Sequence, residues 1–302
     1  MKRLFKIMIA IVLCLTFVFS AIACSNQNDG DVKTGVQVTY SEKDGGYVLY
    51  KYLPQKNVKE LDLDSAVKEA TKDANAKLVV IKEHAFKNTD NLEKIIIPNT
   101  VKTIEHGIFT NVKNLKEITL PFVGRTAVAD AFFEQTDKGG EEKSVNEERT
   151  FAYLFGHDVY DGGSQVNVST PVAEGEPTVT TIYMPASLQT IKINPAENYN
   201  IPMYAFYGFS ADVNVELGEK VVGIGEGAFS NCVKFVEFNI PATITNIYKN
   251  AFNGCTALKV INYAGNQTAF DLIVKGEDWN KGLYEYAKIK GDGFEIDLST
   301  ND

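Results

Sequence analysis

An apolar pattern that returns every 23 residues is the feature that most limits the folds open to this 302-residue chain. Phe86 and Phe109 are 23 residues apart, and the apolar residues that follow each of them recur in step. The same spacing separates Phe206, Phe229 and Phe252 near the other end of the chain. A unit of this size is too small to bury its own apolar side. Several units must therefore stack and share one core.

Each unit contains apolar residues at alternate positions, which is the pattern of a short strand with one buried face. A proline often follows and ends the strand, because proline cannot donate a hydrogen bond to a neighbouring strand. The sequence therefore predicts a mainly β repeat solenoid in which these strands form a parallel ladder. The alternating pairs are Ile95/Ile97, Ile118/Leu120, Ile182/Met184, Val215/Leu217, Phe238/Ile240 and Ile261/Tyr263.

The repeated motif is Ile-x-x-x-Ala-Phe-x-x-Cys-x-x-Leu-x-x-Ile-x-Ile-Pro, and residues 224–232 and 247–255 match its first half closely. It resembles the BspA-like (Treponema pallidum-type) leucine-rich repeat over roughly residues 76–265. The resemblance implies a leucine-rich-repeat array with a strand ladder on one side. It also implies a secreted or surface protein of a kind linked to adhesion and host interaction.

The repeat is interrupted once at length, because Pro121 and Pro185 are 64 residues apart where one repeat would take 23. We interpret residues 122–181 as one enlarged repeat, in which residues 152–155 take the place of the Ala-Phe pair. A separate domain is disfavoured because too few apolar residues remain for a second core. Aromatic residues in this segment could line a pocket, although such clusters more often form core.

The N-terminus has the layout of a signal peptide, with a basic start, an apolar run at residues 7–19 and the mostly small residues Ala21-Ile22-Ala23. The apolar run is shorter than the roughly 20 residues that a membrane-spanning helix needs. A plain secretory peptide would also fit the first twenty residues. Cys24 directly after the small residues resembles a bacterial lipobox, which implies that Cys24 carries a lipid. We therefore expect a leader at 1–23, a flexible tether at 24–34 and a lipid-anchored protein on the extracellular face of the cell membrane.

An open solenoid needs caps at its ends, because exposed strand edges invite aggregation. We predict an N-terminal cap at 35–76, made of a β-hairpin from 36–40 and 47–52 and a helix over 65–76 with Ser65 as N-cap. The solenoid then occupies residues 77–265, and residues 266–302 form a C-terminal cap that ends in two short strands.

The charge of the chain argues against nucleic-acid partners. The net charge is −9, and loss of Lys2, Arg3 and Lys6 with the leader leaves −12. A chain this acidic repels phosphate backbones, and it gains nothing from an anionic lipid surface, so its membrane contact must come from the lipid anchor.

The chain offers no recognisable catalytic or metal-binding constellation, and we predict no cofactor. His84, His106 and His157 are interpreted as surface residues without a shared role, since a metal site needs several convergent ligands. Cys232 and Cys255 occupy the same position in adjacent units, where two reduced buried thiols are favoured over a disulfide.

One row of side chains is a candidate binding face. If the alternating apolar residues point inward, the residue between each pair points outward along the ladder. The expected row is Ile96, Thr119, Tyr183, Glu216, Asn239 and Asn262. A preordered face of this kind suits a protein or glycan partner, so we predict a non-catalytic surface protein that acts in adhesion or in host or matrix interaction. The alternatives are a structural envelope protein with no specific ligand, and a hydrolase with its site in the enlarged repeat.

Overall fold

A computed structural model describes residues 35–127, 147–170 and 178–298. All described residues belong to the second of the two units into which the chain divides, Thr34–Asp302. The predicted leader, the tether and Cys24 lie outside the described residues. None of the helices in the described part of the chain has the length and apolar character needed to span a membrane.

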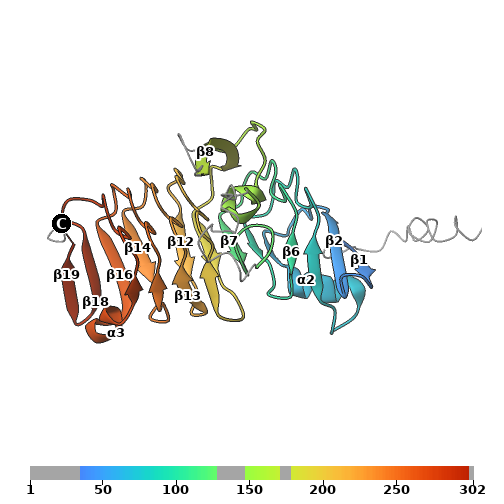
Figure 1. Ribbon diagram of the computed structural model, residues 1–302. Helices are drawn as coiled ribbons and strands as arrows, with labels where there is room; N and C mark the ends of the chain where they lie inside the picture. The colour runs from blue at the N-terminus through green and yellow to red at the C-terminus, as the bar shows by residue number, and fades with distance from the viewer. Residues whose placement is uncertain (1–34, 128–146, 171–177, 299–302) are drawn as a thin grey trace, which may run out of the picture. The chain divides into compact units, whose positions relative to one another are not determined.

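The second unit is a row of stacked coils whose strands form two ladders (Figure 1). In the first ladder, parallel pairs join one set of five neighbouring strands and a second set of three, and the two sets meet where β12 contacts β14. This arrangement confirms the predicted mainly β solenoid. The five strands are β3 (Glu60–Asp62), β5 (Lys94–Ile96), β7 (Glu117–Leu120), β10 (Thr190–Ile193) and β12 (Asn214–Leu217), and the three are β14 (Glu237–Ile240), β16 (Val260–Asn266) and β18 (Lys288–Asp292).

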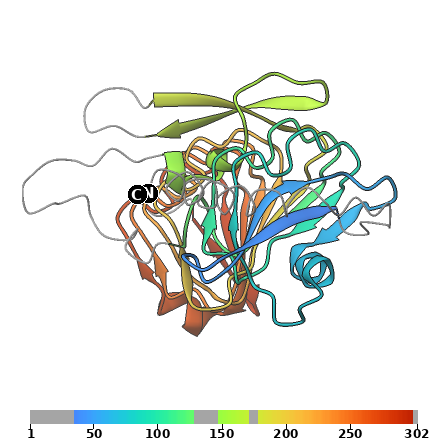
Figure 2. The same cartoon turned by 90° about the vertical axis from the view of Figure 1, so that its right-hand side faces the viewer.

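The second ladder lies along another side of the coils, and the view along the row in Figure 2 shows the strands stacked behind one another. Its strands also pair in parallel from coil to coil. They are β2 (Gly46–Tyr52), β4 (Leu78–Ile81) and β6 (Thr103–Ile104) in one sheet, and β11 (Tyr199–Ile201), β13 (Val221–Ile224), β15 (Asn246–Ile247) and β17 (Val274–Lys275) in another.

A column of phenylalanine rings fills the interior between the ladders. The ring centroids of Phe206 and Phe229 are 5.2 Å apart and those of Phe229 and Phe252 are 5.4 Å apart, with 13° between the planes in both pairs. The ring centroids of Phe86 and Phe109 in the earlier coils are 5.7 Å apart, with the planes tilted by 32°. All five rings are fully buried, as the 23-residue period predicts.

The enlarged repeat continues this column with two phenylalanines instead of one. It contains two short 3-10 turns, η1 (Glu147–Arg149) and η2 (Phe151–Leu154). The Phe155 ring lies 5.8 Å from Phe109 of the preceding coil, and the Phe151 ring stacks at 5.2 Å on Phe206 of the following coil. Backbone hydrogen bonds join the same pairs of coils. Phe109 N of the preceding coil donates to the Leu154 carbonyl, and Phe151 N donates to the Ala205 carbonyl of the following coil. The column of rings is therefore continuous through the enlarged repeat: Phe155 contacts the preceding coil, Phe151 contacts the following coil, and the two rings contact each other.

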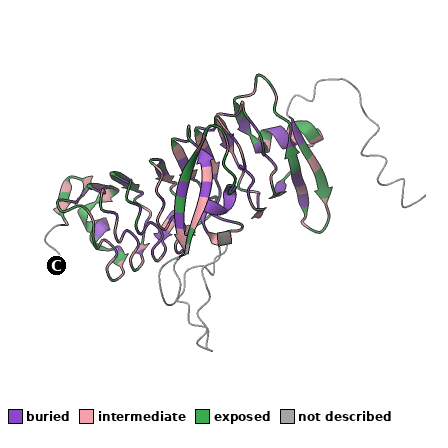
Figure 3. Cartoon of the chain, turned by 90° about the horizontal axis from the view of Figure 1, so that it is seen from above, coloured by how far each residue is buried: buried purple, intermediate pink, exposed green. Residues whose placement is uncertain are grey.

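A hairpin of β8 (Gly163–Thr170) and β9 (Thr178–Pro185) leaves the enlarged repeat and lies outside both ladders. Its strands pair antiparallel, and buried residues alternate along them with exposed or half-buried ones (Figure 3). This corrects one prediction: Ile182 and Met184 belong to the hairpin, and the ladder strand of this coil is β10 with Ile191 and Ile193 inward. Both pairs have period two because both strands bury one face.

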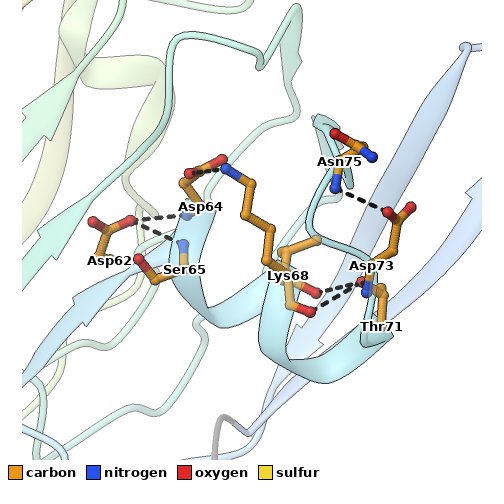
Figure 4. Close-up of polar contacts among 8 residues, drawn as sticks. Asp62, Asp64, Ser65, Lys68, Thr71, Asp73 and Asn75 are labelled. Atoms are coloured by element: carbon orange, nitrogen blue, oxygen red, sulfur yellow. Dashed lines mark hydrogen bonds and ion pairs between the residues drawn. The ribbon is translucent and has the colours of Figure 1, made fainter.

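The N-terminal end is closed by β1 (Val36–Ser41), which pairs antiparallel with β2, and by the helix α2 (Leu63–Thr71). The helix begins two residues before the predicted Ser65, because the Asp62 carboxylate accepts hydrogen bonds from the backbone N–H groups of Asp64 and Ser65 (Figure 4). It ends at Thr71, short of residue 76, since Lys72 adopts the left-handed conformation that stops a helix.

The C-terminal end is closed by β19 (Phe294–Asp297), which pairs antiparallel with β18. A short helix, α3 (Gln267–Asp271), lies between β16 and β17. The ladder is longer than the predicted 77–265, because β3 precedes residue 77 and β18 follows residue 265 in the same register. Each capping segment therefore contributes a strand to the ladder.

Candidate binding face

The outward side of the first ladder carries two parallel columns of side chains, which we call the ladder face. The register of the strands decides which residues belong to it, because within each of the two sets of strands an outward residue pairs with the equivalent residue of the next coil. One column is Asp62, Ile96, Thr119, Lys192, Glu216, Asn239, Asn262 and Lys290, and the other is Glu60, Lys94, Glu117, Thr190, Asn214, Glu237, Val260 and Lys288.

Five of the six predicted residues lie on the ladder face, namely Ile96, Thr119, Glu216, Asn239 and Asn262. Tyr183 does not, because it pairs with Gln165 inside the β8–β9 hairpin. Lys192, which the sequence analysis missed, takes its place between Thr119 and Glu216. The alternating apolar residues Ile191 and Ile193 on either side of Lys192 could have identified it from the sequence.

Charges of alternating sign join the strands of the N-terminal half of the ladder face. The Lys94 and Lys192 ammonium groups lie 3.1 and 3.2 Å from the same Glu117 carboxylate oxygen, and Lys192 also lies 3.6 Å from Glu216. Partial burial opposes ionisation of Glu117, but hydrogen bonds from the two lysines outweigh it and hold the pKa of Glu117 below its ordinary value. Hydrogen bonding to Glu117 likewise raises the pKa of Lys192. These charges already have partners within the protein.

A second ionic group lies just before these strands. Lys59 and Lys116 each place an ammonium nitrogen 2.6 Å from a carboxylate oxygen of Glu93. Hydrogen bonds from Lys116 and Lys59 lower the pKa of Glu93 to about 2. This group links three successive coils beside the ladder face.

The C-terminal half of the ladder face differs in carrying the amides of Asn239 and Asn262 beside its charged residues. Asn262 donates from Nδ2 to Asn239 Oδ1 at 3.1 Å, which links β14 and β16. An exposed aromatic pair lies close by: the Lys259 ammonium is 5.3 Å from the centroid of the Tyr284 ring, and Tyr286 meets Tyr284 edge to face. This end therefore offers amide, ammonium and aromatic groups to a partner.

The two cysteines of the described residues lie in the core. Cys232 and Cys255 are buried free thiols. Their sulfur atoms donate to the carbonyl oxygens of Phe206 and Phe229 at 3.0 and 2.9 Å. Burial raises the pKa of the Cys232 thiol well above its ordinary value, which makes it a poor nucleophile.

The enlarged repeat contributes to a hollow of about 380 Å³. Phe122 and Tyr199 lie on its wall, and the Tyr199 hydroxyl accepts a hydrogen bond from Val123 N. Burial raises the pKa of Tyr199, so the hydroxyl stays protonated. No histidine or cysteine of the described residues lines this hollow, and it shows no pairing of a nucleophile with a base.

Known proteins with similar features are bacterial leucine-rich-repeat proteins. The structure resembles a leucine-rich-repeat protein from Eubacterium ventriosum (13% identity, 82% of this chain and 50% of that chain, TM-score 0.39) and one from Bacteroides ovatus (18%, 78% and 55%, TM-score 0.34). It also resembles the leucine-rich-repeat protein of T. pallidum (14%, 86% and 84%, TM-score 0.30). This chain spans about half the length of the first two. No curated protein matches it significantly.

The family assignment rests on the sequence repeats. A model of the BspA type leucine-rich-repeat region matches residues 71–139 and 179–272 in six copies, which together are more than half of the chain. The interval between the two matches falls within the enlarged repeat, where the regular spacing stops. The chain therefore belongs to the BspA-type leucine-rich-repeat family.

Proposed function

We propose that this protein is a lipid-anchored surface protein that binds a protein or glycan through the ladder face and catalyses no reaction. Leucine-rich-repeat proteins of this family are in general binding proteins. The observation that carries the proposal is the fixed register of the ladder face, where paired strands hold side chains from successive coils in one array. A preordered surface loses little conformational entropy when it docks, so more of the contact energy appears as affinity.

The C-terminal half of the ladder face is the better docking region. In the N-terminal half, Lys94, Glu117 and Lys192 already satisfy one another. Asn239 and Asn262 share one hydrogen bond, which leaves further donors and acceptors on each amide. The exposed rings of Tyr284 and Tyr286, just before β18, add aromatic surface, which suits the contact of a sugar ring or an apolar side chain.

A binding screen tests this proposal. The full chain in detergent is applied to immobilised glycans and to extracellular-matrix and host-surface proteins. We expect saturable binding that Asn239→Ala and Asn262→Ala each weaken at least tenfold. Tyr183→Ala is the matched control, because Tyr183 lies on the hairpin outside the ladder face and its loss should leave affinity unchanged.

Other outcomes count against the proposal. Equal losses of affinity in the Tyr183 and Asn239 variants would show that the docking region is not the ladder face. Silence across the whole screen would favour a structural envelope protein. Hydrolysis of a glycan by the full chain would refute the non-catalytic proposal and favour a hydrolase with its site in the enlarged repeat.

The anchor is proposed on separate grounds, namely the Ala21-Ile22-Ala23 sequence that precedes Cys24. Cys24→Ser should abolish labelling of the protein by a fatty acid in bacterial cells and release it from the membrane fraction. Retention of both the label and the membrane location would rule out lipidation at Cys24.

A further inference from the structure

The three histidines of the chain lie together: Glu83 lies beside His84 and His106, and the His157 ring contacts the His106 ring. Glu83 and His84 follow β4, His106 follows β6, and His157 follows η2 of the enlarged repeat. The rings of His106 and His157 are nearly parallel, with centroids 5.7 Å apart. The fold therefore gathers imidazoles from three successive turns, although their spacing of 22 and 51 residues in the sequence gave no hint of it.

The Glu83 carboxylate faces two of these imidazoles, those of His84 and His106. Its Oε1 lies 3.5 Å from Nε2 of His84 and 3.9 Å from Nδ1 of His106. The neighbouring cations have other partners, since Lys82 pairs with Glu105 at 2.6 Å and Arg125 pairs with Glu148. Within the described ranges no lysine or arginine pairs with Glu83. The ionisable groups paired with its carboxylate are therefore the imidazoles of His84 and His106.

Two of the imidazoles are held by backbone carbonyls. Nδ1 of His84 lies 3.1 Å from the Gly107 carbonyl oxygen, and Nδ1 of His157 lies 3.0 Å from the Thr181 carbonyl oxygen. A carbonyl oxygen only accepts, so each Nδ1 carries the hydrogen and each Nε2 is the basic nitrogen. Histidines that bind metals are usually oriented in this way, by donation from the second ring nitrogen.

We propose that Glu83, His84, His106 and His157 form a surface site for a divalent transition-metal ion of the Zn²⁺ or Cu²⁺ class. Four nitrogen or oxygen ligands at about 2.0–2.1 Å around a tetrahedral ion lie roughly 3.3 Å from one another. The two distances from Glu83 Oε1 approach that spacing. Imidazole and carboxylate ligands select Zn²⁺ and Cu²⁺ over Ca²⁺ and Mg²⁺, which prefer oxygen.

Binding requires a small rearrangement. Among the residues that the structure describes, no three ligand groups already meet at one point. The side chains are 38% exposed at His84, 31% at His106 and 57% at Glu83, so they can turn without disturbing the core. The His106 and His157 rings must leave their parallel contact so that both nitrogens face the ion. The bound ion would then link the coils of β4 and β6 to the enlarged repeat.

Metal titration of the full chain, in detergent and without an affinity tag, tests the site. We expect one Zn²⁺ per chain by calorimetry, and a Cu²⁺ spectrum with nitrogen hyperfine structure by electron paramagnetic resonance. Zn²⁺ should raise the melting temperature, because an ion that binds only the folded state stabilises it. Ca²⁺ should have no effect.

Variants separate this site from chance binding to surface carboxylates. Glu83→Gln and His106→Gln should each weaken Zn²⁺ at least tenfold and remove the rise in melting temperature, with unchanged far-ultraviolet circular dichroism. Glu237→Gln, an exposed carboxylate on β14, is the matched control and should bind as the wild type does. Absence of Zn²⁺ binding, or equal binding by the Glu83 and Glu237 variants, would overturn the proposal.

Discussion

Replacing Phe151 with alanine should destabilise the protein about as much as the same change at Phe229 in the middle of a regular coil. Phe151 is fully buried, and its ring lies 5.3 Å from Phe155, 5.2 Å from Phe206 and 5.8 Å from Phe209. Removal of a buried phenylalanine ring costs about 3–5 kcal/mol. The cost at Phe151 should lie toward the upper end of this range, because each contact between aromatic rings adds about 0.5–1.5 kcal/mol of stability beyond burial and Phe151 makes three of them.

Urea unfolding of the full chain measures this loss. Circular dichroism follows the strands, and Trp279 is a single fluorescent reporter in the C-terminal coils, where its ring packs 6.4 Å from Phe252. Val159→Ala is the control, since Val159 is 76% exposed and its loss should cost less than about 0.5 kcal/mol. A cost below about 1 kcal/mol at Phe151, with the expected cost at Phe229, would refute the idea that this ring carries the core across the enlarged repeat.

Three further predictions concern acid stability, a close backbone approach and the thiols. The pKa of Glu93 is about 2 in the folded protein against an ordinary value of 4.5, so the unfolded state binds more protons between these values. The melting temperature should therefore fall as pH drops from 4.5 toward 2, and less steeply in Glu93→Gln. Gly227→Ala should cost about 1–3 kcal/mol in urea unfolding, because Gly227 has φ 56° and a Cβ there would strike the Tyr204 ring; Tyr204→Gly should recover part of that loss. Alkylation followed by peptide mapping should leave Cys232 and Cys255 unmodified in buffer and modified in urea, and modification in buffer would contradict their burial.

The repeated core was predictable from sequence because identical coils must place identical residues in the interior. Phe206, Phe229 and Phe252 are stacked as their spacing predicts. The ladder strand at the end of the enlarged repeat was not predictable in the same way. Ile182/Met184 and Ile191/Ile193 both alternate, and only the pairing partners distinguish a hairpin strand from a ladder strand.

The start of α2 and the histidine cluster show two other limits. Asp62 and Ser65 are both good N-cap residues, and the choice was decided by which of them ends a ladder strand. The contact between His106 and His157 depends on the path of the enlarged repeat, which has no counterpart in the other coils. Long-range contacts that occur once in a chain leave no periodic signal.

The alternating charges on the ladder face have a consequence for how the chain finds its order. Stacked coils are alike, so during folding a strand could pair with the strand of the coil after next instead of its neighbour. Omission of the β7 coil would bring Lys94 toward Lys192, and omission of the β10 coil would bring Glu117 toward Glu216. Exposed ion pairs add little to stability, about 0–1 kcal/mol each. The like-charge approaches in a miscounted array would oppose that array by a similar amount, so the charge pattern and the phenylalanine column favour the same order of coils.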